Sequence, residues 1–175
     1  ASSACDDPLG RGVTMCADMG PFYDVGSGHW HGFVASQDRG TKGDCCDCYK
    51  LRFRNSSVQM VVQVVTHGHV HGLFDLLVPG GGLGEFDGCS AMFPRASEAA
   101  QSRFGGLHRR DGCEAFAASE AAAAACRWLF DGGLFPYPQQ GVPFAGDALA
   151  VHASREPCPE VLNRRSGCTA TRSEA

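Results

Sequence analysis

The sequence has no apolar stretch long enough to cross a membrane and no cluster of lysine and arginine. A membrane span needs about 20 consecutive apolar residues, and a nucleic-acid interface needs a clustered basic face. Lys and Arg total 15 against 19 Asp and Glu, and the net charge of −4 is dispersed along the 175 residues. We therefore predict that neither a membrane nor a nucleic acid is a partner of this protein.

Internal repeats, linkers and a leader segment are also missing. Because no segment repeats and no linker divides the chain, its length predicts one domain, large enough for a hydrophobic core. We assign residues 1–168 to this domain and residues 169–175 to a polar tail. The first residue is Ala1 and no signal peptide follows it, so we expect a chain that is either intracellular or already processed.

The ten cysteines favour the second possibility. They are dispersed along the chain, and the cluster at Cys45, Cys46 and Cys48 lacks the paired spacing of a zinc ribbon. An even, dispersed set of cysteines is typical of a disulfide framework formed in an oxidising compartment. Asn55 begins a glycosylation sequon, which fits the same environment. The sequence therefore predicts a secreted, extracellular protein.

The chain contains 23 glycines and 9 prolines, which favours a loop-rich β protein over a helix bundle. Residues 46–54 alternate in polarity, as expected for a strand with one buried face. A turn at 55–57 joins them to a returning strand at 58–65, whose paired valines predict burial on both faces. Further strands are expected at 13–16, 29–35 and 148–153, and helices at 96–103 and 114–129. Together these elements predict a small closed β-barrel.

Asp75 is a lone carboxylate between Phe74 and the apolar residues 76–78. Because burial disfavours the ionised form, we expect the pKa of Asp75 to be raised. A carboxylic acid of raised pKa is what a general acid needs at neutral pH. The alternative is structural, with Asp75 capping a turn or pairing with an arginine.

Three histidines precede Asp75 at alternate positions, His67, His69 and His71. On a strand all three would face one way, and three imidazoles on one face can hold Zn²⁺ or Cu²⁺. The alternative is a polar loop that lines a cleft, because glycines interrupt any strand here.

Trp30 lies between two histidines and offers either a platform for an apolar sugar face or a core side chain. The same two alternatives apply to Phe22, Tyr23, Trp128 and Tyr137.

The run at residues 74–89, FDLLVPGGGLGEFDGC, resembles glycoside hydrolase family 45. Other segments follow the family's order along nearly the whole chain, among them Cys16-Ala17-Asp18, Cys45-Cys46-Asp47-Cys48-Tyr49, Met60-Val61-Val62-Gln63 and Cys158-Pro159-Glu160. The resemblance implies a six-stranded double-psi β-barrel, shared with expansins, with long disulfide-tied loops and one or two short helices. It also implies a secreted endo-β-1,4-glucanase that acts on cellulose or a related β-glucan, and we expect no cofactor.

By the same resemblance, Asp75 is the general acid that protonates the departing glycosidic oxygen in an inverting reaction. Such a reaction needs a second carboxylate, about 6.5–9.5 Å away, to activate water. The family's base lies in an N-terminal Tyr/Trp-Asp-Cys-Cys strand that this sequence lacks, and Asp6 and Asp7 are poor substitutes. A family aspartate in a Gly-Gly-Asp loop is also absent. The residues expected to bind substrate are Thr66, His67, His69 and His71 of the shorter loop found here, and Trp30.

The resemblance implies three disulfides, Cys46–Cys168, Cys48–Cys158 and Cys113–Cys126. In the family, the partners of the other four cysteines lie in the N-terminal region that is missing here. We therefore expect a disulfide-linked N-terminal peptide held through Cys5, Cys16, Cys45 and Cys89. The alternative is that these four pair among themselves.

Two other functions remain open. The missing base and the altered histidine loop favour a catalytically inactive relative, either an expansin-like glycan binder or an extracellular structural protein. The three histidines would instead favour a metal-binding extracellular domain through His67, His69 and His71.

Overall fold

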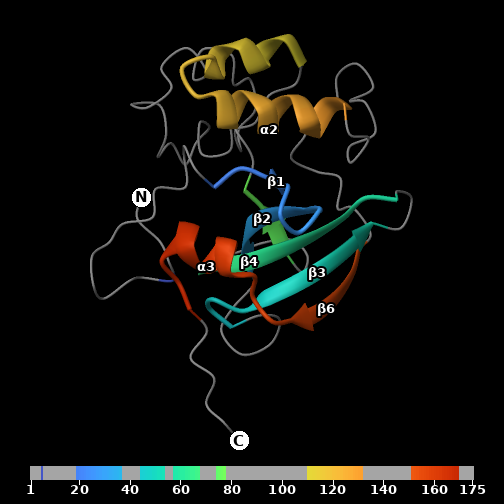
Figure 1. Cartoon of the computed structure of the whole chain (residues 1–175), viewed down its shortest axis with the longest axis vertical. Helices are drawn as coiled ribbons and strands as arrows, with labels where there is room; N and C mark the ends of the chain where they lie inside the picture. Colours follow the sequence, from blue (N-terminus) through green and yellow to red (C-terminus); the bar gives the residue numbers. More distant parts are fainter. Residues whose placement is uncertain are drawn as a thin grey trace, which may run out of the picture.

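The computed structural model describes residues 5, 19–36, 44–53, 57–67, 74–77, 110–131 and 151–169. These residues form a six-stranded sheet and three helices (Figure 1). The strands are β1 (Phe22–Asp24), β2 (His29–Ser36), β3 (Cys48–Phe53), β4 (Gln59–His67), β5 (Phe74–Leu76) and β6 (Val151–Glu156). The helices are the 3-10 helix η1 (Arg110–Phe116), α2 (Glu120–Asp131) and α3 (Glu160–Ser166). None of these helices is long and apolar enough to span a bilayer.

The strands lie in the order β1-β2-β4-β3-β6, and β5 also pairs with β2. β3 and β4 form the antiparallel hairpin that the sequence predicts. β2 and β4 are parallel, with β3 on the far side of β4. β1 pairs with the beginning of β2 and β5 with its end, so these two short strands follow one another along the same edge of β2. The prediction of a mainly β, six-stranded fold is confirmed.

β4 is the central strand, and residues 60–65 are all buried. Its side chains alternate between two hydrophobic clusters on opposite faces. One cluster contains Val34, Leu51, Met60, Val62 and Val64. The other contains Met19, Phe33, Cys48, Val61, Val65 and Leu162, the last of which belongs to α3 (Figure 1). The predicted burial of this strand on both faces is therefore confirmed.

The helix predicted at residues 114–129 is present as two elements, because η1 ends at Phe116 and α2 begins at Glu120. The Cys113–Cys126 disulfide joins them. Arg110 adds two hydrogen bonds to the carboxylate of Asp131, at 2.6 and 2.7 Å. The two elements therefore form one disulfide-tied unit, which contacts the sheet through β1.

Three elements were not predicted: β1, β5 and α3. The last strand, β6, runs to Glu156 rather than to residue 153, and residues 148–150 of the predicted strand lie outside the described residues. The strand expected at 13–16, the helix expected at 96–103, and Asn55 lie outside the described residues.

The three disulfides implied by the family resemblance are present, Cys46–Cys168, Cys48–Cys158 and Cys113–Cys126. A fourth joins Cys5 to Cys45, and no cysteine in the described part of the chain is free. The Cys5 N–H donates to the Val65 carbonyl at 2.7 Å, which brings Cys5 beside β4 and within reach of Cys45. The expected disulfide-linked peptide is therefore wrong for Cys5 and Cys45, whereas Cys16 and Cys89 lie outside the described residues.

A β-bulge at the start of β3 places two consecutive cysteines. Cys46 has a left-handed backbone with φ of 67°. Its N–H donates to the Val64 carbonyl and the Val64 N–H donates to the Asp47 carbonyl, so two residues stand opposite one. The first position of such a bulge usually carries glycine, because it requires positive φ. The bulge directs Cys46 to Cys168 while Cys45 bonds Cys5.

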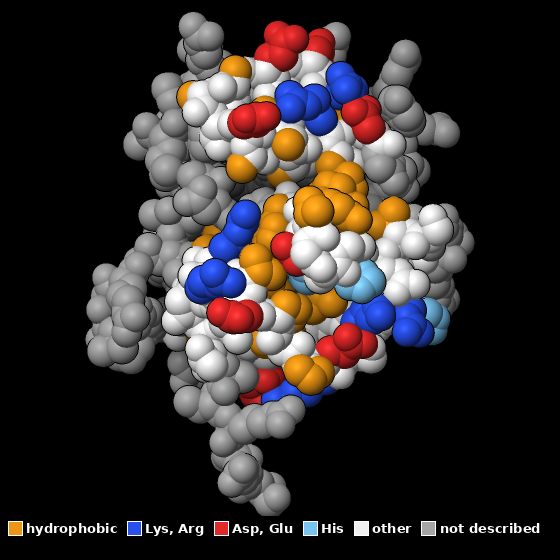
Figure 2. All heavy atoms as spheres, viewed as in Figure 1, with side chains coloured by type: hydrophobic (Ala, Val, Ile, Leu, Met, Phe, Trp, Pro, Cys, Tyr) orange, Lys and Arg blue, Asp and Glu red, His pale blue; other side chains and the backbone are white. Residues whose placement is uncertain are grey.

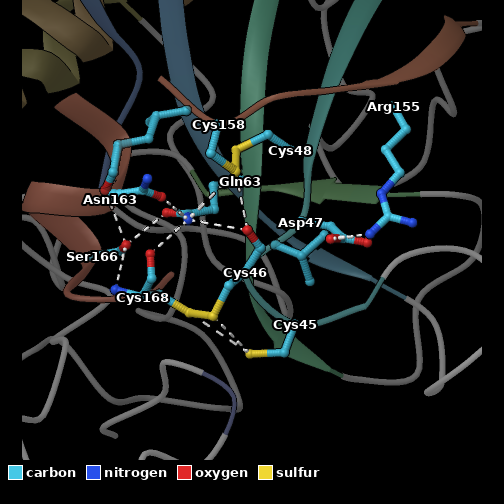
Figure 3. The surroundings of a disulfide bond; sticks show 12 residues. Cys45, Cys46, Asp47, Cys48, Gln63, Arg155, Cys158, Asn163, Ser166 and Cys168 are labelled. Atoms are coloured by element: carbon cyan, nitrogen blue, oxygen red, sulfur yellow. Dashed lines mark hydrogen bonds and ion pairs between the residues drawn. A yellow bond between two sulfur atoms is a disulfide. The ribbon is translucent and has the colours of Figure 1, made fainter. Parts of the chain in front are cut away.

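Gln63 is fully buried on β4 and connects this strand to α3 and to the disulfides (Figure 3). Its amide nitrogen donates to the carbonyls of Cys46 and Cys168, at 3.2 and 3.0 Å, and to Asn163 Oδ1 at 3.0 Å. Ser166 Oγ donates to Gln63 Oε1 at 2.6 Å. Because an unpaired buried polar group is costly, this one amide stabilises the contact between β4, α3 and the Cys46–Cys168 bond.

We predict that Gln63→Leu lowers the free energy of unfolding by about 2–4 kcal/mol, because it leaves buried carbonyls and a hydroxyl without their donor or acceptor. Denaturant unfolding measures this loss. Gln59→Leu is the matched control, because Gln59 is exposed on the same strand, and its effect should stay within about 0.5 kcal/mol. Equal effects of the two substitutions would contradict the role assigned to Gln63.

Candidate active site

Asp75 lies at the middle of β5 and its side chain is exposed. Its neighbours Phe74 and Leu76 pack against the cluster that contains Val62. The ring centroids of Phe74 and Tyr49 are 5.0 Å apart. Successive residues of a strand point to opposite faces, so the apolar neighbours face inward and Asp75 faces outward. The expectation that the apolar run buries Asp75 is therefore wrong.

Three residues form a row across the ends of three strands. Asp75 of β5 pairs with Ala35 of β2, and Ala35 pairs with Thr66 of β4. Directly paired residues on neighbouring strands point to the same face. The carboxylate of Asp75 and the hydroxyl of Thr66 therefore lie on one face, separated by the methyl group of Ala35.

This row depends on a second β-bulge. The pairing of β2 with β4 shifts immediately before Ala35, where β4 contains one additional residue, Val65. Without Val65 as the extra residue, Thr66 would pair with Ser36 and point to the other face, because a shift of one residue reverses every side chain. Bulges next to active sites commonly redirect a side chain in this way. Here the bulge brings Thr66 to the face of Asp75.

The residues next to this row point to the opposite face. Ser36 pairs with His67 on one side and with Phe74 on the other. Ser36 Oγ lies 3.2 Å from His67 Nδ1. The structure thus brings Thr66 together with Asp75 but directs His67 away from both. His69 and His71 lie outside the described residues.

Trp30 is distant from Asp75. It lies five residues before Ala35 on β2, about 17 Å along the strand. Its ring stacks on that of Trp128 of α2, with ring centroids 3.9 Å apart and planes at 23°. The ring centroids of Trp30 and Tyr23 are 5.6 Å apart. Figure 2 shows apolar side chains gathered between α2 and the sheet on the visible face, with charged side chains of both signs around them. These contacts favour a packing role for Trp30 between α2 and the sheet.

Asp47 is a buried carboxylate with an assigned partner. It is 4% exposed, and its Oδ1 accepts a hydrogen bond from Arg155 Nη2 at 2.6 Å. Burial, followed by the Asp47 charge, raises the pKa of Tyr49. Arg155 of β6 therefore engages one oxygen of this buried carboxylate.

A second polar cluster lies at the turn between β1 and β2. His31 is 1% exposed, and its Nε2 lies 3.0 Å from Ser27 Oγ and 4.0 Å from Asp24 Oδ2. His31 Nδ1 has no hydrogen-bond partner. The serine and the aspartate thus meet the same ring nitrogen, whereas a catalytic triad needs them on opposite nitrogens. Burial lowers the pKa of His31, opposed by the Asp24 charge.

In the described part of the chain, one group of at least three residues of the kinds that bind metals lies close together. The sulfur atoms of Cys45, Cys46 and Cys168 lie within 4.8 Å of one another. All three are in disulfides, and a metal needs the thiolate form. This group is therefore no metal centre.

The fold and the row define a small disulfide-tied β protein that presents a carboxylate and a hydroxyl on one face of a sheet edge. Known proteins identify the class further. The family model described as glycosyl hydrolase family 45 matches residues 1–169. The chain belongs to this family.

The proteins similar to this chain include two endoglucanases and one solved cellulase structure. An endoglucanase of Cryptopygus antarcticus is 31% identical over 164 residues, which cover 90% of this chain and 67% of that protein. Endoglucanase B of Cellvibrio japonicus is 30% identical over 194 residues, 94% of this chain but only 36% of that protein. The crystal structure of a cellulase from the Antarctic springtail Cryptopygus antarcticus matches with a TM-score of 0.64 and 28% identity, over 88% of this chain and 71% of that one. The structural match agrees with the expected double-psi β-barrel.

We predict that His31 makes stability depend on pH. Its pKa is lowered below the usual 6.5 in the folded protein, so below about pH 6.5 the unfolded chain binds a proton that the folded chain does not. Stability is therefore lost as the pH falls through 6.5, by at most about 1.4 kcal/mol per pH unit, and the loss ends below the folded-state pKa. Denaturant unfolding of the wild type and of His31→Gln between pH 7.5 and 5.5 measures the effect. The difference between the two should shift in favour of the variant as the pH falls, and a constant difference would refute the assignment.

Proposed function

We propose that this chain is an endo-β-1,4-glucanase, acting on cellulose or a related β-glucan with Asp75 as its general acid. The observation that carries the proposal is the outward position of Asp75 on β5, between two residues that anchor the strand in the core. Membership of family 45 and the relatives named endoglucanase support it.

In this proposal Asp75 donates its proton to the glycosidic oxygen as the bond to the leaving sugar breaks. A β-glucan chain crosses the row above Ala35, whose small side chain leaves room between the carboxylate and Thr66. Within the described part of the chain, the Thr66 hydroxyl donates one long hydrogen bond, 3.5 Å, to the His67 carbonyl. It is therefore able to bind a sugar hydroxyl or the attacking water.

The proposed reaction inverts the anomeric centre, and it requires a second carboxylate about 6.5–9.5 Å from the first. The row itself offers Ala35 and Thr66 beside Asp75. Among the described acids, Asp47 is held by Arg155, and Asp24 pairs with His29 at the opposite end of β2. Neither of these two acids is therefore assigned as the base.

We also propose that the protein acts outside the cell. Four disulfides in the described part of the chain support this location, because such bonds persist in oxidising compartments.

The first test is Asp75→Asn. Loss of a general acid costs about 10²–10⁴ in rate, so we expect kcat on a soluble β-1,4-glucan to fall by that factor. The free energy of unfolding should change by less than about 0.5 kcal/mol, because the side chain is exposed. Reducing-end formation and denaturant unfolding measure the two quantities.

Asp131→Asn is the matched control for this variant. Asp131 is also exposed, and it pairs with Arg110 at the end of α2. Its replacement should leave kcat unchanged. Wild-type turnover by Asp75→Asn would refute the assignment of the general acid.

The second test is stereochemical. If hydrolysis inverts the anomeric centre, the reducing end first released from a β-1,4-glucan is the α anomer. Proton NMR in the first minutes, before mutarotation equilibrates the anomers, distinguishes the outcomes. An initial β anomer would show retention and exclude the single-displacement mechanism.

One observation favours a non-catalytic alternative: the described row contains a single carboxylate. An expansin-like glycan binder or a structural protein would sediment with insoluble cellulose yet release no reducing ends. Binding and reducing ends measured on the same cellulose sample separate this function from hydrolysis.

A further inference from the structure

His67 and Ser36 meet directly beside the row that contains Asp75. Ser36 is fully buried, and its Oγ lies 3.2 Å from His67 Nδ1. In register, Ser36 stands between His67 on β4 and Phe74 on β5. The contact therefore joins β2 and β4, two of the three strands that the row crosses, one residue further along β2.

The position of His67 argues against direct contact with a substrate bound above Ala35. His67 follows Thr66 on β4, and successive strand residues point to opposite faces. Because Thr66 shares the face of Asp75, the His67 side chain lies on the other side of the sheet, where its Nδ1 meets the buried Ser36.

The contact between Ser36 and His67 depends on the bulge at Val65. A register without the bulge would pair Val65 with Ala35 and Thr66 with Ser36, and would turn the Thr66 hydroxyl away from Asp75. In that register His67 would move one residue past Ser36. The hydrogen bond between Ser36 and His67 therefore forms in the bulged register and favours it.

We propose that His67 is a positioning residue: through Nδ1 and Ser36 it holds the bulged end of β4 so that the Thr66 hydroxyl faces the side of Asp75. This inference rests on the proposed glucanase function. It assigns His67 an indirect role, in place of direct substrate binding.

The test compares His67→Asn with His67→Gln. The Asn amide can occupy the place of Nδ1 and keep the bond to Ser36, whereas the Gln amide reaches the place of Nε2. We expect His67→Asn to keep kcat on a soluble β-glucan within about threefold of the wild type. His67→Gln should lower kcat by about 10–100-fold with little change in KM, because misplaced groups cost rate rather than binding.

A double-mutant cycle shows whether His67 acts through Thr66. In a Thr66→Val background, His67→Gln should cost no further loss of kcat, because the hydroxyl that it positions is gone. Fully additive losses would overturn the inference. Circular dichroism and denaturant unfolding of each variant establish that the comparison is made between folded proteins.

The remaining outcomes are distinct. If Gln restores activity and Asn does not, His67 acts through Nε2 and the inference is wrong. If the wild type hydrolyses β-glucan and both variants match it, the inference fails while the glucanase proposal stands. If the wild type releases no reducing ends, both fail, and this is seen before any variant is compared.

Discussion

β4 is hydrogen-bonded on both edges and buried on both faces, and the described structure depends on this double constraint. Its parallel partner β2 and its antiparallel partner β3 fix its register from two sides. Near its end each edge carries a bulge, at Val65 toward β2 and at Cys46 toward β3. A strand held in this way cannot slide, so these irregularities are fixed positions at which side chains are redirected.

The two bulges reorient different side chains. The one toward β2 turns Thr66 to the face of Asp75, and the one toward β3 turns Cys46 to Cys168. Between them Gln63 connects β4 to α3. The candidate site and the covalent framework therefore lie at the same end of one strand, so that a substitution in the framework is expected to reach the row through the backbone of β4.

Local patterns in the sequence were sufficient to predict the hairpin of β3 and β4 and the burial of β4 on both faces. They could not predict that Asp75 is exposed. The face that a short strand buries is decided by its pairing with β2, and that pairing is not local in the sequence. The bulge at Val65 has no sequence signal for the same reason. α3 did have local signals, an acidic Glu160 in its first turn and a left-handed Gly167 after its last. The helix was not predicted because it is short and follows two prolines, which are typical of turns.

The consecutive cysteines Cys45 and Cys46 have a mechanical consequence. Each is bonded to a distant part of the chain, Cys5 and Cys168. A tensile force applied between Cys5 and Cys168 passes through two disulfides and one peptide unit, and it bypasses the hydrogen bonds of the sheet. Stretching from these two points therefore cannot unzip β4 from its neighbours until a reductant has cut one of the two bonds.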